Sequence, residues 1–218
     1  MPDGVVLVAD GRDHRMFGSG PQITDGVDKL QPISDCVFAV PFGITAASSS
    51  AIRMLQRVWG VTQVPERIGR IVHRATRKGW RQFISQLDPH IDRRDPRLGV
   101  GLLVAGIAGE PFICEAICSE HTDIAPSVGT GAWVTAVRGG EDQQARERFE
   151  EAAKAIIDSV GWEGDEGPHN AMTQALMGAA ADVIDQAAKE SQWIGWPIRG
   201  VVVRRGFPTL KEIVRCKR

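Results

Sequence analysis

The sequence contains no tyrosine among its 218 residues, which excludes any mechanism that uses a tyrosine as acid, base or nucleophile. Its four cysteines are too few for a disulfide-stapled scaffold, and this indicates a reducing, cytoplasmic compartment. No apolar run approaches the ~20 residues of a membrane-spanning helix, and the first residues lack the basic and apolar segments of a signal peptide. We therefore expect a soluble cytoplasmic protein with no membrane partner.

The sequence also lacks a net charge that would attract it to a polyanion. Lys and Arg number 26 against 27 Asp and Glu, giving a formal net charge of -1, and we expect no nucleic-acid partner. The charges are nevertheless unevenly distributed: residues 53–97 hold eleven Lys and Arg and four Asp and Glu, whereas residues 110–167 hold four and thirteen. Internal or inter-subunit charge pairing is one interpretation, and solvated faces are the other.

Metal and cofactor motifs are also missing. Cys114 and Cys118 lie on one face of a predicted strand, with no histidine cluster in the sequence beside them, so no zinc site is expected. Segment 129–131 lacks the longer glycine fingerprint and following lysine of a phosphate-binding loop, and segment 48–50 lacks the glycines of a nucleophile elbow. We predict no metal and no cofactor.

The spacing of the apolar residues predicts the order of the elements along the chain. Strands come first, followed by two helices, further strands, two more helices and a final strand. Residues 10–26 are rich in glycine and polar side chains and are predicted as loop, with room for short strand pieces. Thr45 or a nearby serine is the expected cap of the first helix, which ends before Gly60, and Pro41 and Gly43 are expected to end the strand before it. The other elements are predicted as strands at 5–9, 36–40, 98–105, 111–118 and 198–203, and as helices at 65–83, 143–160 and 171–188.

The clustering of the helices in pairs favours an α+β fold, in which a core of two sheets carries a helical pair on each outer face. With 43% apolar residues, the length suits one domain covering residues 1–218.

The strongest functional signal comes from three segments near the start: Gly4–Arg12, Thr24–Leu30 and Val40–Ala46. In this order and spacing they resemble the proteasome β-subunit family of N-terminal nucleophile (Ntn) hydrolases. The resemblance implies a catalytic aspartate at Asp10, a catalytic lysine at Lys29 and an oxyanion-hole amide at Gly43, fourteen residues after the lysine. More loosely, Thr130 takes the place of a serine beside the family's active site, and Glu190 takes the place of an aspartate near its C-terminus.

What the resemblance implies is a four-layer αββα sandwich and a threonine-type peptidase subunit. Such a subunit acts on polypeptide substrates within a homo-oligomeric ring or with other proteasome-like subunits. In this chemistry an N-terminal threonine uses its own α-amino group, whose ordinary pKa is near 8, as the proton shuttle. A lysine tunes that amine, an aspartate balances the lysine, and a backbone amide receives the oxyanion.

The family places its nucleophile on a strand that precedes the residue matched by Gly4. We therefore expect the first strand and the nucleophile to be missing from this sequence and to lie upstream of Met1. Two alternatives remain open. One is a non-catalytic structural ring subunit or binding module, and the other is an Ntn amidohydrolase that acts on a non-protein amide.

Overall fold

The structure is a computed structural model of the chain and describes residues 4–17, 20–60, 65–95, 98–124, 128–130, 143–159, 171–190 and 194–216. The chain forms two compact units. Unit 1 consists mainly of residues 31–133, and unit 2 combines residues 3–30 with 134–218. Among the described helices, none has the length and apolar character that a membrane span requires.

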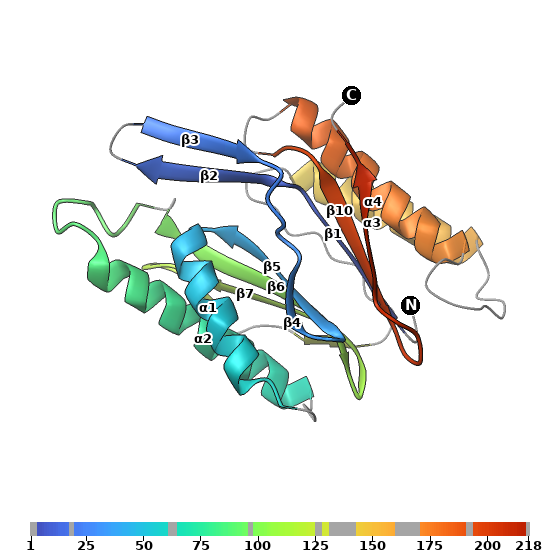
Figure 1. Cartoon of the computed structure of the whole chain (residues 1–218), viewed down its shortest axis with the longest axis horizontal. Helices are drawn as coiled ribbons and strands as arrows, with labels where there is room; N and C mark the ends of the chain where they lie inside the picture. The colour runs from blue at the N-terminus through green and yellow to red at the C-terminus, as the bar shows by residue number, and fades with distance from the viewer. Residues whose placement is uncertain are drawn as a thin grey trace. The chain divides into compact units, whose positions relative to one another are not determined.

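Unit 1 is built on an antiparallel sheet with the strand order β4-β5-β6-β7-β8, in which β9 also pairs with β7 (Figure 1). The β6–β7 hairpin pairs continuously from Val100↔Cys118 to Ala108↔Glu110, so only Gly109, at φ 76°, forms the turn. The strands are β4 (Gln31–Ser34), β5 (Val37–Gly43), β6 (Val100–Ala108), β7 (Glu110–Cys118), β8 (Asp123–Ile124) and β9 (Val128–Thr130).

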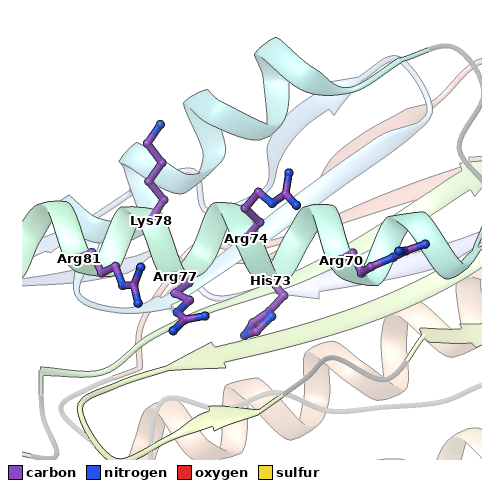
Figure 2. Close-up of a pocket in the computed structure, with 6 residues that line it drawn as sticks. All are labelled: Arg70, His73, Arg74, Arg77, Lys78 and Arg81. Carbon is purple, nitrogen blue, oxygen red and sulfur yellow. The ribbon is translucent and has the colours of Figure 1, made fainter.

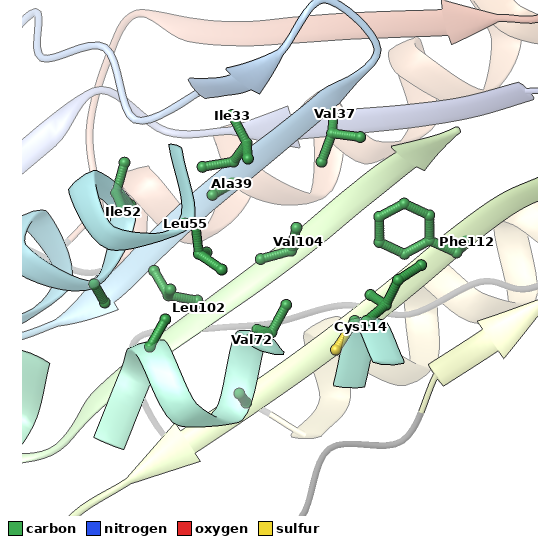
Figure 3. Close-up of a cluster of buried hydrophobic side chains, with 14 residues drawn as sticks. Ile33, Val37, Ala39, Ile52, Leu55, Val72, Leu102, Val104, Phe112 and Cys114 are labelled. Carbon is green, nitrogen blue, oxygen red and sulfur yellow. The ribbon is translucent and has the colours of Figure 1, made fainter. Parts of the chain in front are cut away.

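Helices α1 (Thr45–Val58) and α2 (Pro65–Gln86) cover one face of this sheet. Alternate residues of β7 point at them, because side chains alternate across a strand, and Phe112, Cys114 and Ala116 are buried there. The helices contribute Leu55 and Val72, which are completely buried in the same cluster (Figure 3). These contacts form the hydrophobic core of unit 1.

Unit 2 contains a three-stranded antiparallel sheet with the order β1-β10-β11 and a separate hairpin formed by β2 and β3. Helix α4 packs against all three strands of the larger sheet, and α3 packs against α4. The elements are β1 (Gly4–Ala9), β2 (Arg12–Phe17), β3 (Gly20–Asp25), α3 (Gln143–Ser159), α4 (Ala171–Glu190), β10 (Ile198–Arg204) and β11 (Leu210–Arg215).

The predicted mixture of strands and four helices is confirmed among the described residues. Segment 10–26, predicted as loop with room for short strand pieces, contains the two paired strands β2 and β3. Strand β5 extends beyond the predicted residues 36–40 and ends at Gly43, one of the two residues expected to end it. It passes through Pro41 because β4 pairs only with residues 37–39 of β5, so the proline needs no partner on that side. Strands β4 and β11 were not predicted.

The predicted cap of the first helix was also wrong. The N-cap residue is Ile44, which has no polar side chain to offer, and no side-chain cap is present there. Instead the Ile44 amide donates to the Gly99 carbonyl at 3.0 Å, which fixes the chain as it enters the helix. The four-layer αββα sandwich and the single domain over residues 1–218 stay predictions.

Candidate functional site

Asp10 and Lys29, the two residues that the resemblance matches to a catalytic aspartate and lysine, are in contact in unit 2. Asp10 follows β1, Lys29 lies between β3 and β4, and Lys29 Nζ donates to Asp10 Oδ1 at 2.8 Å. Their side chains are 17% and 21% exposed, respectively, so the ion pair is largely shielded from water. Such shielding strengthens the attraction relative to an ion pair on the surface.

The second carboxylate oxygen of Asp10 is held by the backbone. Oδ2 accepts the amide N–H of Arg12 at 3.0 Å and that of Gly195 at 3.3 Å. With the lysine, this gives the carboxylate three donors from three separate parts of the chain, which fixes its position. Backbone bonds from Gly11 to Gly195 (3.0 Å) and from Val27 to Gly11 (2.9 Å) tie the same segments together.

The lysine is positioned from its other side by a neighbouring ion pair. Asp28 points away toward β11, where Lys211 Nζ reaches its Oδ2 at 2.5 Å and donates to the Leu30 carbonyl at 2.8 Å. The Asp28 Oδ1 atom also accepts the Leu30 amide at 3.1 Å. These bonds fix the backbone on both sides of Lys29, so its side chain is directed to Asp10 rather than free to turn.

Sequence reasoning missed Gly195. A Cβ atom there would collide with Arg12 Nε and lie 2.8 Å from Asp25 Oδ1, so a larger residue would force the side chains of the bidentate Arg12–Asp25 ion pair, at 2.6 and 3.0 Å, to shift. The hydrogen bond from Arg12 to Asp25 raises the pKa of the guanidinium. The only signal in the sequence is a glycine before the Trp196-Pro197 pair, and nothing in that signal points to a residue 185 positions earlier.

Gly43 ends β5 in unit 1, and glycine is required there for a structural reason that is independent of catalysis. Its φ of 76° lies in the left-handed region, and a Cβ would collide with the carbonyl oxygen of Gly99. The close approach of two strand ends therefore accounts for this glycine on its own. Its role as an oxyanion-hole donor stays a prediction.

Glu190 and Thr130, the two residues that the resemblance matches more loosely, each lie at the end of an element. Glu190 is exposed at the end of α4 and accepts a hydrogen bond from Gln186 Nε2 at 3.1 Å. Thr130 ends β9 in unit 1, where it pairs with Phe112, and its neighbour Gly131 lies outside the described residues. The roles that the resemblance implies for these two residues stay predictions.

Metal chemistry finds no support in the part of the chain that the structure describes, where no group of three or more His, Cys, Asp and Glu side chains is placed to hold an ion. Cys114 is fully buried on β7, and burial, with a smaller contribution from the Glu115 charge, raises the pKa of its thiol to about 12. It therefore stays protonated near neutral pH and serves as a core side chain rather than a ligand or nucleophile.

The arrangement at Asp10 can hold a lysine ammonium at a fixed point. A positive charge so placed lowers the proton affinity of a nearby amine, and this is the requirement for an amine that takes a proton from a hydroxyl nucleophile at neutral pH. The Asp10–Lys29 pair therefore supplies the positive charge that such a site requires, but it does not supply the nucleophile.

Comparisons with known proteins give evidence on the fold alone. The sequence matches no protein-family profile, and no curated protein matches it. Among solved structures, it is similar to Anbu (ancestral beta-subunit) from Yersinia bercovieri, with a TM-score of 0.57 and 13% sequence identity. That similarity covers 98% of this chain and 85% of the Anbu chain. The chain is therefore similar in fold to a proteasome-like β-subunit, at a sequence identity too low to carry activity with it.

Proposed function

We propose that this chain is a proteasome-like β-type subunit of an oligomeric, cytoplasmic assembly that cleaves peptide bonds with an N-terminal threonine. One observation carries the proposal: the Lys29 ammonium is held 2.8 Å from an Asp10 carboxylate with three hydrogen-bond donors, in a fold similar to that of Anbu. An αββα sandwich over the whole chain belongs to the same proposal.

In the proposed reaction the threonine hydroxyl attacks the peptide carbonyl carbon, and its proton passes to the threonine's own α-amino group. The Lys29 charge keeps that amine neutral and ready to accept the proton, and Asp10 keeps Lys29 in place. The Gly43 amide is the proposed donor to the oxyanion. Collapse of the intermediate expels the amine product with the proton, and water then hydrolyses the ester.

The proposal is tested by removing the lysine charge from the protein expressed with any in-frame codons that precede Met1. Lys29→Met is expected to lower peptide hydrolysis and covalent labelling by an inhibitor directed at N-terminal threonines by about 100-fold or more, the usual scale for losing a group that controls a catalytic proton. Lys189→Met is the matched control, because it breaks another Lys–Asp ion pair of unit 2, the Asp185–Lys189 pair of α4, and leaves Asp10 and Lys29 untouched.

Three results separate the alternatives. Equal labelling of the Lys29→Met and wild-type proteins contradicts the role of the Asp10–Lys29 pair. Absence of both labelling and hydrolysis in an assembled wild-type protein makes the chain a structural ring subunit or binding module. Turnover of small non-peptide amides without cleavage of peptides makes it an amidohydrolase of the same fold.

A further inference from the structure

The short segment that carries Lys29 is not part of any strand. Residues 26–30 lie between β3, which ends at Asp25, and β4, which begins at Gln31. The segment begins at Gly26, whose φ of 88° lies in the left-handed region and where an added Cβ would meet no atom within 4 Å. Glycine is the residue with the greatest backbone freedom, so the path of the chain from Gly26 to Lys29 depends on bonds made by other parts of the molecule.

The side chain of Arg199, on β10, makes two of these bonds. Its Nη1 donates to the Val27 carbonyl at 2.9 Å, and its Nη2 donates to the Gly26 carbonyl at 3.2 Å. These carbonyls belong to the two peptide groups that follow Gly26. One planar guanidinium that binds both of them fixes the orientation of both peptide groups, two residues before Lys29.

The fold places Arg199 next to the other member of the ion pair as well. In the pairing of β1 with β10, Arg199 lies opposite Ala9, which directly precedes Asp10. The register of β10 with β11 shifts between Ile198 and Arg199, and an irregularity of this kind redirects the side chain beside it. The backbone of Arg199 is therefore paired beside Asp10, while its side chain holds the segment of Lys29.

We propose that Arg199 is a positioning residue of the candidate site. Its guanidinium fixes the start of segment 26–30 and so keeps the Lys29 ammonium at Asp10 Oδ1. Lys211 holds the far end of the same segment through its bond to the Leu30 carbonyl, so Lys29 is fixed from both sides. The effect of Arg199 on catalysis rests on the proposed function, whereas its effect on the position of Lys29 does not.

The first measurement needs no enzymatic activity, because it follows the chemical reactivity of Lys29. The protein is treated with a trace of acetic anhydride, and mass spectrometry compares acetylation of Lys29 with that of Lys78 in the same molecule. Lys78 is an exposed residue of unit 1 that projects from α2 (Figure 2). In the wild-type protein Lys29 should react slowly, because its side chain is only 21% exposed and is bonded to Asp10.

We expect Arg199→Met to raise the acetylation of Lys29 relative to Lys78 by about 10-fold, the scale of losing a hydrogen bond to a charged group. Arg215→Met is the matched control. It removes an arginine from the adjacent strand β11, whose bonds go to Asp182 and to the Val214 carbonyl. This control should leave the ratio within about 2-fold of the wild-type value.

A ratio in Arg199→Met that equals that of the control overturns the inference, even where the variant unfolds at a lower temperature, because Arg199 then stabilises the fold without placing Lys29. Should the circular dichroism spectrum show that Arg199→Met is unfolded, Arg199→Lys replaces it. A lysine keeps the charge but lacks the planar fork, so the ratio should rise by about 3-fold. A wild-type ratio in Arg199→Lys then overturns the inference.

The second measurement tests whether Arg199 acts through Lys29. In the protein expressed with any in-frame codons that precede Met1, Arg199→Met is expected to lower the rate of labelling by an inhibitor of N-terminal threonines by about 10-fold. In the Lys29→Met background the same substitution should change that rate by less than about 2-fold, because the residue that it positions is already absent.

The outcomes separate this inference from the proposed function. Equal losses of labelling in both backgrounds overturn the positioning role and leave the proposed peptidase intact. A wild-type protein that is not labelled contradicts the proposed peptidase. The acetylation ratio then still decides whether Arg199 holds Lys29 in place.

Discussion

The two helical pairs each contain a glycine in the middle of a helix, and the two glycines have opposite roles. A Cβ at Gly79 of α2 would collide with the Ala47 carbonyl oxygen and lie 3.1 Å from the Ala51 side chain, so α1 and α2 cross too closely for any other residue. A Cβ at Gly178 of α4 would meet no atom within 4 Å. A glycine in a helix sequence therefore does not by itself indicate close helix packing. Close packing can be inferred only when the position of the neighbouring helix is known.

The same two pairs differ in how their charges are balanced. In unit 2, Asp185 of α4 pairs with Lys189 at 2.6 Å, and Asp182 pairs with Arg215 of β11 at 2.7 Å. The sequences of α1 and α2 together contain eight Lys and Arg and one acid, Glu66. Acidic and basic side chains are therefore mixed along α4 but not along α1 and α2.

The substitutions with the largest expected effect on stability test whether the two units unfold in one transition. Phe112, which stacks on Trp59 at 5.9 Å between ring centres, fills the core of unit 1, and Met177 is buried on α4 of unit 2. We expect Phe112→Ala to cost about 3–5 kcal/mol and Met177→Ala about 2–5 kcal/mol of unfolding free energy. Because the sequence predicts one domain, calorimetry should show a single transition that both substitutions lower.

Two separate transitions, each lowered by one substitution only, would contradict the single domain. Ile213→Ala serves as the control, because this side chain is 55% exposed and its loss should leave the transition nearly unchanged.

Replacing each of the two helical glycines by alanine is expected to change the free energy of unfolding by an intermediate amount, in opposite directions. Gly79→Ala should destabilise the protein by roughly 1–3 kcal/mol, since the new methyl group forces the helices apart. Gly178→Ala should stabilise it by roughly 0.5–1 kcal/mol, since alanine favours the helix and meets no obstacle. Urea unfolding of both variants measures the difference. A change of the same sign in both would remove the contrast between the two helix pairs.

The smallest expected effect on stability comes from the Asp185–Lys189 ion pair of α4. Hydrogen bonds from Lys189 and then Trp196 lower the pKa of Asp185, so the carboxylate is more acidic in the folded than in the unfolded chain. The resulting stability is present above the unfolded pKa, near 3.9, and is lost as the pH falls through the lower folded value.

Asp185→Asn should therefore reduce stability near pH 7 and flatten its decline in acid, as measured by thermal unfolding between pH 7 and pH 3. Glu212→Gln on β11 is the control, because it removes a carboxylate that is separate from the bonds of Asp185 to Lys189 and Trp196. A decline as steep in Asp185→Asn as in the wild type would assign the acid sensitivity to other carboxylates.

The sequence predicted the elements whose apolar pattern is strong and missed those held by pairing alone. Helix α2 begins at Pro65, and β7 ends at Cys118, both as predicted, because each buries one clear face. Strand β11 was missed, since its burial alternates between partly buried and exposed residues and its position depends on pairing with β10. The predicted strand at 36–40 stopped short of Gly43, because the missing partner beside Pro41 is a property of the sheet.

The candidate site divides along similar lines. Asp10 and Lys29 were predicted to act together, and the structure joins them. The Gly195 amide was not predicted, because a backbone donor leaves no residue-specific mark in the sequence. Glu190 was chosen by its place in the chain, and the structure puts it at an exposed helix end. Side chains with a charge partner can be predicted from sequence, whereas contacts made by the main chain must be observed.

The bond from Gly195 to Asp10 also has a consequence for how the protein is made. At about 5–20 residues per second, the ribosome adds residue 195 roughly 10–40 s after residue 10. The strand that leads to Asp10 waits equally long, because β1 pairs with β10. The carboxylate therefore receives its full set of donors only after residue 195 has been added, and the nascent chain carries an incomplete site until then.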